Sequence, residues 1–217
     1  MSAAQRLRDV QDRIRRAADL VNRNPDDITL IAVSKTRTVD EIKELVDLGV
    51  QDFGESKVQE AIPKVEAFTG NLRWHFIGHL QSNKAKKCAE YFPFIHSISS
   101  ENQLREIEKG NRDAQAFIEV NLARELQKSG IFPETLDQFW KSTLQYKRTL
   151  VRGLMTIGPQ GATEARTRAL FRQLAELSQA CGLPWLSMGM SSDFELGIQE
   201  GATHIRVGTA LFGARGE

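Results

Sequence analysis

A lysine stands directly after a short apolar segment in the first fifth of the chain, where its amine could support covalent chemistry. Residues 28–34 read ITLIAVS, a β-branched run that predicts a buried strand, and Lys35 follows it. An ammonium at such a place would be partly desolvated, which lowers the pKa of a lysine and frees its amine for Schiff-base formation with an aldehyde. The alternative is a lysine whose long side chain reaches solvent from the strand end.

Small and hydroxyl-bearing residues near the C-terminal end could complete such a site. Residues 187–193, SMGMSSD, predict a turn in which Ser191 and free N–H groups suit an anion, although serines there could equally cap a helix. Farther on, Arg206 supplies a permanent cation, Gly208 a backbone that a ligand can approach closely, and Thr209 a hydroxyl. An amine and an anion cradle together would hold a phosphorylated aldehyde, and pyridoxal 5'-phosphate is the candidate cofactor.

Other arrangements of reactive residues are weaker. His75 and His79 are four residues apart, but Gly78 lies between them and no third ligand converges on them, so no metal site is expected. The glycines at 153, 158 and 161 do not match a dinucleotide-binding fingerprint, and no Ser-His-Asp arrangement stands out.

A regular alternation of strands and helices would position these residues. Strand-like segments begin near residues 28, 50, 72, 94, 116, 150, 185 and 204, with a helical segment between each consecutive pair. Several strands are continuously apolar, which is typical of parallel strands covered by helices on both faces. The pattern predicts an α/β protein, a compact (β/α)8 TIM-type barrel in which ligands bind at the carboxyl ends of the strands. An open doubly wound sheet is the alternative.

The segments around these units complete the predicted architecture. An amphipathic helix is expected over about residues 2–22, and the barrel over about residues 28–213. Since no linker or composition shift marks a boundary, one domain is expected over residues 1–217. In the helical segment 58–68, Pro63 predicts a helix that starts late or kinks.

Composition and charge argue against several classes of protein. The chain has 29 basic and 28 acidic residues, a formal charge of +1, which does not suit a nucleic-acid binder. No apolar run approaches the roughly 20 residues of a membrane span. The two cysteines, Cys88 and Cys181, lie far apart and favour a reducing compartment. We therefore expect a cytoplasmic monomer without nucleic-acid or membrane partners.

Motifs along nearly the whole chain resemble those of one family. They are AVSK at 32–35, DFGE at 52–55, RWHFIGHLQSNKAK at 73–86, IHSI at 95–98, VN at 120–121, KSG at 128–130, RGLMTI at 152–157, LSMGMSSD at 186–193 and RVGTALFG at 206–213. On these motifs the chain resembles the pyridoxal phosphate homeostasis proteins, which are similar to the barrel domain of bacterial alanine racemase.

The resemblance implies a role for each matching residue. Lys35 would hold pyridoxal 5'-phosphate as a Schiff base, and Ser191, Gly208 and Thr209 would hold its phosphate. Arg206 would face the pyridine nitrogen, where a guanidinium disfavours protonation of the ring and weakens it as an electron sink.

The chain departs from the family pattern at one place. The family usually has Asn and an aromatic residue after FGE, whereas this chain has Ser56 and Lys57. Serine is shorter and makes fewer hydrogen bonds, so no contact with the cofactor ring is assigned to Ser56.

The resemblance implies a non-catalytic protein that buffers pyridoxal 5'-phosphate or delivers it to apo-enzymes. An amino-acid racemase is the alternative, and a scaffold with an incidental cofactor is a third possibility. A racemase needs two bases, of which Lys35 could be one. In alanine racemases the other is a tyrosine from a second domain, but this chain ends at Glu217 and its two tyrosines, Tyr91 and Tyr146, fall within or at the end of predicted helices. We therefore expect a protein that is not an enzyme.

Overall fold

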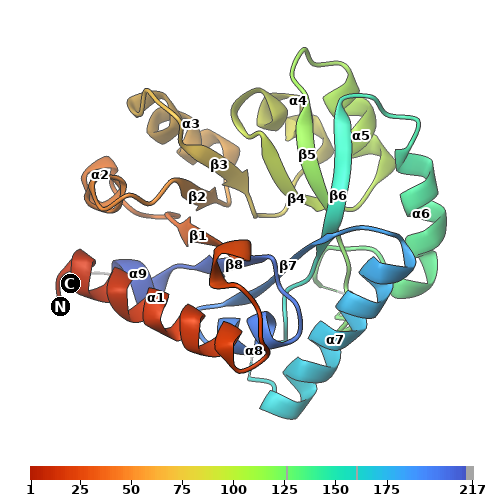
Figure 1. Ribbon diagram of the computed structural model, residues 1–217. Helices are drawn as coiled ribbons and strands as arrows, with labels where there is room; N and C mark the ends of the chain where they lie inside the picture. The colour runs from red at the N-terminus through yellow and green to blue at the C-terminus, as the bar shows by residue number, and fades with distance from the viewer. Residues whose placement is uncertain (126, 160, 214–217) are drawn as a thin grey trace.

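A closed barrel of parallel strands forms the centre of the molecule. The computed structural model describes residues 1–125, 127–159 and 161–213. Within them the strands follow one another around the barrel in sequence order, and β1 pairs with β8 to close it (Figure 1). The strands are β1 (Thr29–Val33), β2 (Asp52–Glu55), β3 (Arg73–Phe76), β4 (Phe94–Ile98), β5 (Ala114–Glu119), β6 (Thr149–Met155), β7 (Trp185–Met190) and β8 (His204–Val207). The predicted (β/α)8 barrel is confirmed, and the open sheet is wrong.

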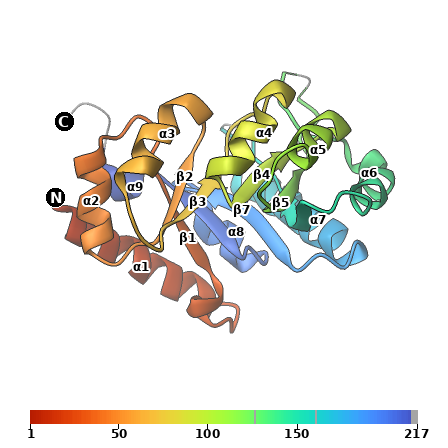
Figure 2. The ribbon, with the colours of Figure 1, turned by 90° about the horizontal axis from the view of Figure 1, so that it is seen from above.

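Helices alternate with the strands and surround the barrel (Figure 2). They are α1 (Ala3–Asp19), α2 (Val39–Asp47), α3 (Val58–Ala67), α4 (Ser82–Tyr91), α5 (Glu101–Glu108), α6 (Leu136–Thr143), α7 (Glu164–Ala180), α8 (Phe194–Gln199) and α9 (Thr209–Phe212). Helix α2 begins with a capping box, in which Thr38 Oγ1 accepts from Glu41 N–H and the Glu41 carboxylate accepts from Thr38 N–H. None of the helices in the described ranges has the length and apolar composition needed to cross a membrane.

The predicted N-terminal helix is present as α1 and packs against the last units of the barrel. Figure 1 shows it lying beside α8 and α9. Its apolar stripe, which includes Leu7, Val10 and Ile14, is buried. Arg13 Nε donates to Glu195 Oε1 of α8 at 2.6 Å and clamps the two helices together. The assignment of the whole of residues 1–217 to a single domain stays a prediction.

Helix α3 differs from the prediction. It begins at Val58, five residues before Pro63, and continues to Ala67, so it does not start late. Proline lacks the N–H that would bond the carbonyl of Gln59, which costs helix stability. Val58 and Ala61 are buried against the core, and tertiary packing of this kind supplies most of the stability of a short helix.

The barrel interior is built largely from rings. His75 stacks on Phe94 with ring centroids 4.5 Å apart, and His96 stacks on Phe117 at 4.1 Å. His204 lies edge-on to Phe117 at 5.0 Å. The first four of these residues come from the neighbouring strands β3, β4 and β5, and His204 comes from β8, with side chains that point into the barrel. The interior therefore contains polar rings within an aromatic core.

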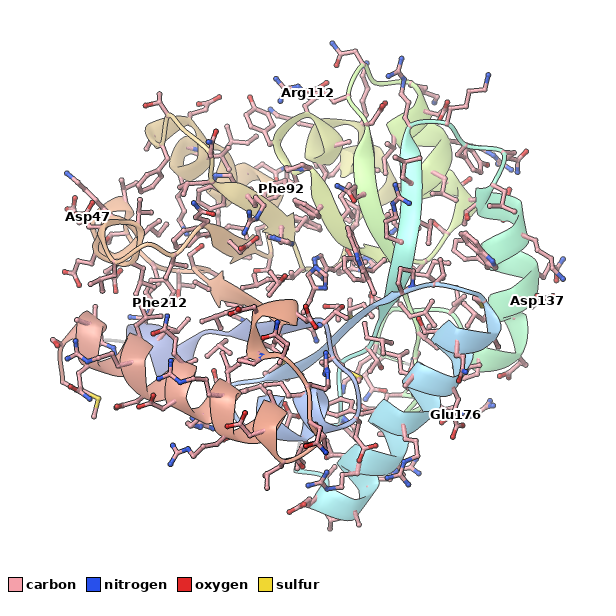
Figure 3. All side chains as sticks on the ribbon, in the orientation of Figure 1. Asp47, Phe92, Arg112, Asp137, Glu176 and Phe212 are labelled. Carbon is pink, nitrogen blue, oxygen red and sulfur yellow. The ribbon has the colours of Figure 1, made fainter. Side chains whose placement is uncertain are left out.

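The outer surface has the opposite character. Figure 3 labels Asp47, Arg112, Asp137 and Glu176 at the periphery, and all four are exposed. Phe92, labelled in the same view, is fully buried under α4 and belongs to the layer between helices and barrel.

Candidate functional site

The five residues predicted to form a site lie together at the carboxyl ends of the strands. Lys35, Ser191, Arg206, Gly208 and Thr209 all line one cleft of about 410 Å³. They come from the segments that follow β1 and β7 and from β8 with its following turn. Because the barrel closes between β1 and β8, residues that are far apart in the sequence meet at one mouth.

A tight turn carries Lys35 into the mouth. Ser34 C=O accepts a hydrogen bond from Arg37 N–H at 3.0 Å, and between them Thr36 has φ 66°, a left-handed conformation that is uncommon for a β-branched residue. Lys35 is exposed, so partial burial of its ammonium, one of the two possibilities that the sequence offered, is wrong. The other possibility, a lysine that reaches solvent from the strand end, is confirmed.

A buried ion pair supports this turn from below. Ser34 Oγ donates to Glu55 Oε1 at 2.7 Å. Lys64 Nζ donates to the same carboxylate at 2.8 Å and to the carbonyl of Ser34 at 2.9 Å. Glu55 is only 1% exposed, and all three groups satisfy one another. The backbone just before Lys35 is therefore held in place by α3 and β2.

The opposite side of the cleft offers hydrogen-bond donors. Gly208 N–H donates to Ser191 Oγ at 3.1 Å, which ties the turn after β7 to the turn after β8. Within the described residues, the N–H groups of Ser192 and Thr209 donate to no protein acceptor. Free N–H groups beside hydroxyls suit an anion such as a phosphate.

Gly208 also suits the binding of an anion in the cleft. Its φ is −111°, outside the left-handed region, and a Cβ placed on it would meet Val33 no closer than 3.5 Å. Neither its φ nor crowding within the protein therefore requires glycine here. The close approach of a ligand to the backbone would explain it.

Arg206 is held rigidly at the floor of the cleft. The residue is 4% exposed, with Nη1 donating to Ser187 Oγ at 2.5 Å and Nη2 donating to the Thr156 carbonyl at 2.8 Å. Burial lowers its pKa from 12.5 to about 10, while Asp193 and Glu119 oppose that change. Arg206 is therefore still a cation at neutral pH.

A chain of hydrogen bonds continues from Arg206 through the barrel. Ser187 Oγ lies 2.8 Å from His96 Nδ1, and His96 Nε2 lies 3.0 Å from His75 Nδ1. His75 Nε2 in turn lies 3.0 Å from Asp52 Oδ1. The cleft is thus connected to the first residue of β2, at the amino end of the barrel.

The groups at the two ends of this series of hydrogen bonds, Asp52 and Arg206, determine which atom donates in each bond. Ionised Asp52 can only accept, so Nε2 of His75 carries the hydrogen and its Nδ1 accepts from His96. His96 Nδ1 must then accept from the Ser187 hydroxyl, whose oxygen accepts from Arg206. Burial lowers the pKa of His75, and that of His96 well below its ordinary value, so both rings are neutral as this arrangement requires.

Asp52 is secured at the far end by a cation. Arg73 Nε and Nη2 donate to its two oxygens at 2.7 and 2.5 Å. The hydrogen bonds from Arg73 and His75 outweigh burial and hold the pKa of Asp52 at about 2. A fixed negative charge therefore terminates the chain.

The two histidines with helix-like spacing do not form a metal site. His75 is buried in the chain just described, whereas His79 is exposed in the mouth, where its Nδ1 lies 2.5 Å from Ser129 Oγ. Across the described residues no group of His, Cys, Asp or Glu side chains could hold a metal ion.

Sequence reasoning missed two residues of the mouth. Ser56, which was left without a role, lines the cleft beside Lys35. Glu119 ends β5 and lines a neighbouring cavity that also contains Lys35. The signal for Glu119 was present, because a charged residue closing the apolar run AFIE is the same pattern that singled out Lys35.

Known proteins share both the sequence and the fold. Residues 6–216 match the family described as alanine racemase, N-terminal domain. The pyridoxal phosphate homeostasis protein of Aquifex aeolicus is 40% identical over 226 residues, covering 99% of each chain. That of Pseudomonas aeruginosa is 40% identical over 219 residues, covering 98% of this chain and 95% of the relative. The chain belongs to the pyridoxal phosphate homeostasis protein family.

Solved structures place this family member among similar barrels. PipY of Synechococcus elongatus PCC7942, with pyridoxal phosphate bound, is 41% identical with a TM-score of 0.79, covering 93% of this chain and all of that one. The same protein without the cofactor has a TM-score of 0.82. Alanine racemase from Corynebacterium glutamicum is 15% identical with a TM-score of 0.71, and this likeness concerns the fold alone.

Proposed function

We propose that the protein binds pyridoxal 5'-phosphate in the cleft at the carboxyl ends of the strands and acts in homeostasis of the cofactor, buffering it or delivering it to apo-enzymes. The observation that carries the proposal is the meeting of Lys35, Ser191, Arg206, Gly208 and Thr209 in one cleft. The relatives in Aquifex and Pseudomonas are named for this function, and PipY has been solved with pyridoxal phosphate bound.

Each residue has a part in this proposal. Lys35 holds the aldehyde carbon as a Schiff base, and the exposed turn that carries it leaves the amine accessible. Ser191, Gly208 and Thr209 hold the phosphate. Arg206 faces the pyridine nitrogen, and its permanent charge keeps that nitrogen unprotonated. When bound, the cofactor supplies an electron sink, which an unprotonated ring weakens.

A racemase on the same barrel is the alternative, and the site lacks the tyrosine that alanine racemases use. Neither of the chain's two tyrosines lines the cleft. Tyr91 ends α4 and donates its hydroxyl to Glu66 at 3.0 Å. A non-catalytic role is therefore proposed, together with the cytoplasmic location and the monomeric state expected from the sequence.

Borohydride reduction tests the attachment to Lys35. The purified protein is expected to be yellow, and reduction followed by peptide mass mapping should find the cofactor fixed on Lys35. Lys35→Ala should lose the reducible adduct, whereas Lys57→Ala, which removes an exposed lysine paired with Glu60, should keep it. Retention of the same adduct by Lys35→Ala would refute the assignment.

Optical rotation separates the two functions. The loaded protein is incubated with single enantiomers of amino acids, and no sustained loss of rotation is expected. Continued racemisation over many turnovers would overturn the non-catalytic role.

A further inference from the structure

Glu119 is a buried acid at the mouth to which the proposed function gives no role. It is the last residue of β5 and is 7% exposed. It lines a cavity of about 320 Å³ that shares Lys35, Ser56, Ile77 and Ile157 with the cofactor cleft. The carboxyl group therefore faces a space directly beside the proposed cofactor.

The carboxyl group of Glu119 has no hydrogen-bond donor among the described residues. The bond that Glu119 accepts from Ile131 N–H, at 2.9 Å, involves its backbone carbonyl only. Other buried carboxyl groups of the chain are paired: Asp52 with Arg73 and His75, and Glu55 with Lys64 and Ser34. The fully enclosed side-chain oxygens without a partner among the described residues are those of Ser97 and Thr149, and the Glu119 oxygens are not among them. The carboxyl group of Glu119 is therefore unpaired but still open to the cavity, where a ligand can reach it.

Three polar neighbours of Glu119 in the cavity make their hydrogen bonds elsewhere, and Lys35, which also lines the cavity, makes none to Glu119. Asn121 donates its amide to the Glu125 carbonyl at 2.9 Å and accepts from the N–H of the same residue. Lys128 pairs with the Glu125 carboxylate at 2.9 Å, and His79 lies 2.5 Å from Ser129 Oγ. None of these groups turns a donor toward Glu119.

The backbone at Gly130 packs so closely against Glu119 that only glycine fits there. Gly130 has φ +106°, and a Cβ on it would lie 3.2 Å from Glu119 Cγ and 2.9 Å from the backbone nitrogen of Asn121. This close approach allows the neighbouring Ile131 N–H to donate a hydrogen bond to the Glu119 carbonyl oxygen. The carboxyl group is thereby kept from water on that side and is left facing the cavity.

We propose that Glu119 and its cavity form a subsite for the protonated amino group of a primary amine, placed beside the cofactor on Lys35. An ammonium supplies the hydrogen-bond donors that the carboxylate lacks and adds a positive charge beside it to that of Arg206. Ile77, Val120 and Ile157 line the same cavity and suit a short alkyl chain. The subsite rests on the proposed function, since it gives a recipient's amine a place next to the cofactor that it would take over.

Two sources could present this chemistry: a free amino acid, or the side chain of a lysine in a recipient protein. n-Butylamine reproduces the lysine side chain, and L-alanine reproduces an amino acid with its carboxylate. Arg206 donates to Ser187 and Thr156, Lys128 pairs with Glu125, and the amine of Lys35 carries the reduced cofactor, so none of these three lining cations is free to pair with the carboxylate of alanine. We therefore expect the alkyl amine to bind more tightly.

Calorimetric titration at pH 8 tests the subsite. The protein is first loaded and reduced, so that the cofactor is fixed and no exchange with the amine can occur. n-Butylamine should bind to the wild type, and Glu119→Gln should weaken its binding by about tenfold or more, as for loss of a charged hydrogen bond. Glu119→Asp keeps the charge and should bind better than Glu119→Gln. Glu164→Gln, which removes the same charge from an exposed pair with Arg168, should bind like the wild type.

The outcomes separate the two proposals. Failure of borohydride to label Lys35 would count against the proposed function alone, because the same titration of the cofactor-free protein still tests the subsite. Equal binding of n-butylamine by the wild type and Glu119→Gln would overturn the subsite, and so would weaker cofactor binding in Glu119→Gln with unchanged amine binding. Tighter binding of L-alanine than of n-butylamine would assign the subsite to free amino acids and overturn the lysine preference.

Discussion

Replacing Glu119 by glutamine should stabilise the protein, although it removes a charged group from the mouth. Burial raises the pKa of Glu119 from 4.5 to about 7, and Arg206 offsets this only in part. Between these two pH values folding takes up a proton, because the carboxyl group is neutral in the folded protein and ionised in the unfolded chain. The free energy of unfolding therefore falls as the pH rises from 4.5 to 7, and above pH 7 the full penalty is present.

The size of the effect follows from the two pKa values. At about 1.4 kcal/mol per pH unit, a rise from 4.5 to about 7 corresponds to about 3 kcal/mol. Glutamine has the same shape and no charge, so Glu119→Gln should gain up to about 3 kcal/mol at pH 8. For a domain of this size that corresponds to a rise in Tm of about 6 to 12 °C.

Thermal and urea unfolding of the cofactor-free protein at pH 5, 6, 7 and 8 provide the assay. The advantage of the variant should be small at pH 5 and grow to its full value at pH 8. Glu55→Gln is the matched control: it should destabilise by about 2 kcal/mol, because it leaves Lys64 buried without its carboxylate. If Glu119→Gln is less stable than the wild type at pH 8, or its advantage does not change with pH, Glu119 is not an unpaired buried acid.

Three further substitutions test the scaffold of the site. Asp52→Asn should lower the free energy of unfolding at pH 7 by about 2 kcal/mol, because the pKa of Asp52 is about 2 instead of 3.8. This contribution is present above pH 3.8 and is lost as the pH falls through about 2. Urea titrations of both proteins at pH 7 and pH 2.5 can measure it. Gly208→Ala should leave Tm within about 2 °C, since its Cβ meets Val33 only at 3.5 Å, while equilibrium dialysis should show weaker binding of pyridoxal 5'-phosphate. Gly78→Ala should fail to fold by circular dichroism, because its Cβ would lie 2.1 Å from the Ser56 carbonyl oxygen.

The sequence predicts the part of the site that depends on strand ends. In a parallel barrel every strand delivers its last residues to one face, so Lys35 and Arg206 could be placed together without knowledge of the packing. The same rule covers Glu119, whose place at the end of β5 is equally visible in the sequence. The sequence left two environments open for Lys35, burial or exposure at the strand end, and the turn in which Thr36 adopts φ 66° belongs to the exposed one.

The chain of hydrogen bonds through the barrel could not be predicted. His96 lies 21 residues from His75 and 91 residues from Ser187, and their contacts depend on the register between strands. Register shifts occur between β4 and β5 and between β7 and β8, and a shift of one residue would turn each side chain to the other face. The register between neighbouring strands cannot be read from a single sequence.

Arg206 and Glu119, two of the charged groups at the mouth, differ in the way that a permanently bound ligand and an exchanging ligand would require. Arg206 is fixed by Ser187 and Thr156, to which its guanidinium can only donate. Among the described residues the carboxyl group of Glu119 has no hydrogen-bond partner, and burial makes its charge costly although Arg206 offsets part of that cost. A group that always faces the same ligand gains from rigid partners, whereas a group that must receive and release a ligand keeps its hydrogen-bonding capacity open. In the proposed function, the unpaired carboxyl of Glu119 would therefore serve the exchange of the cofactor rather than its storage.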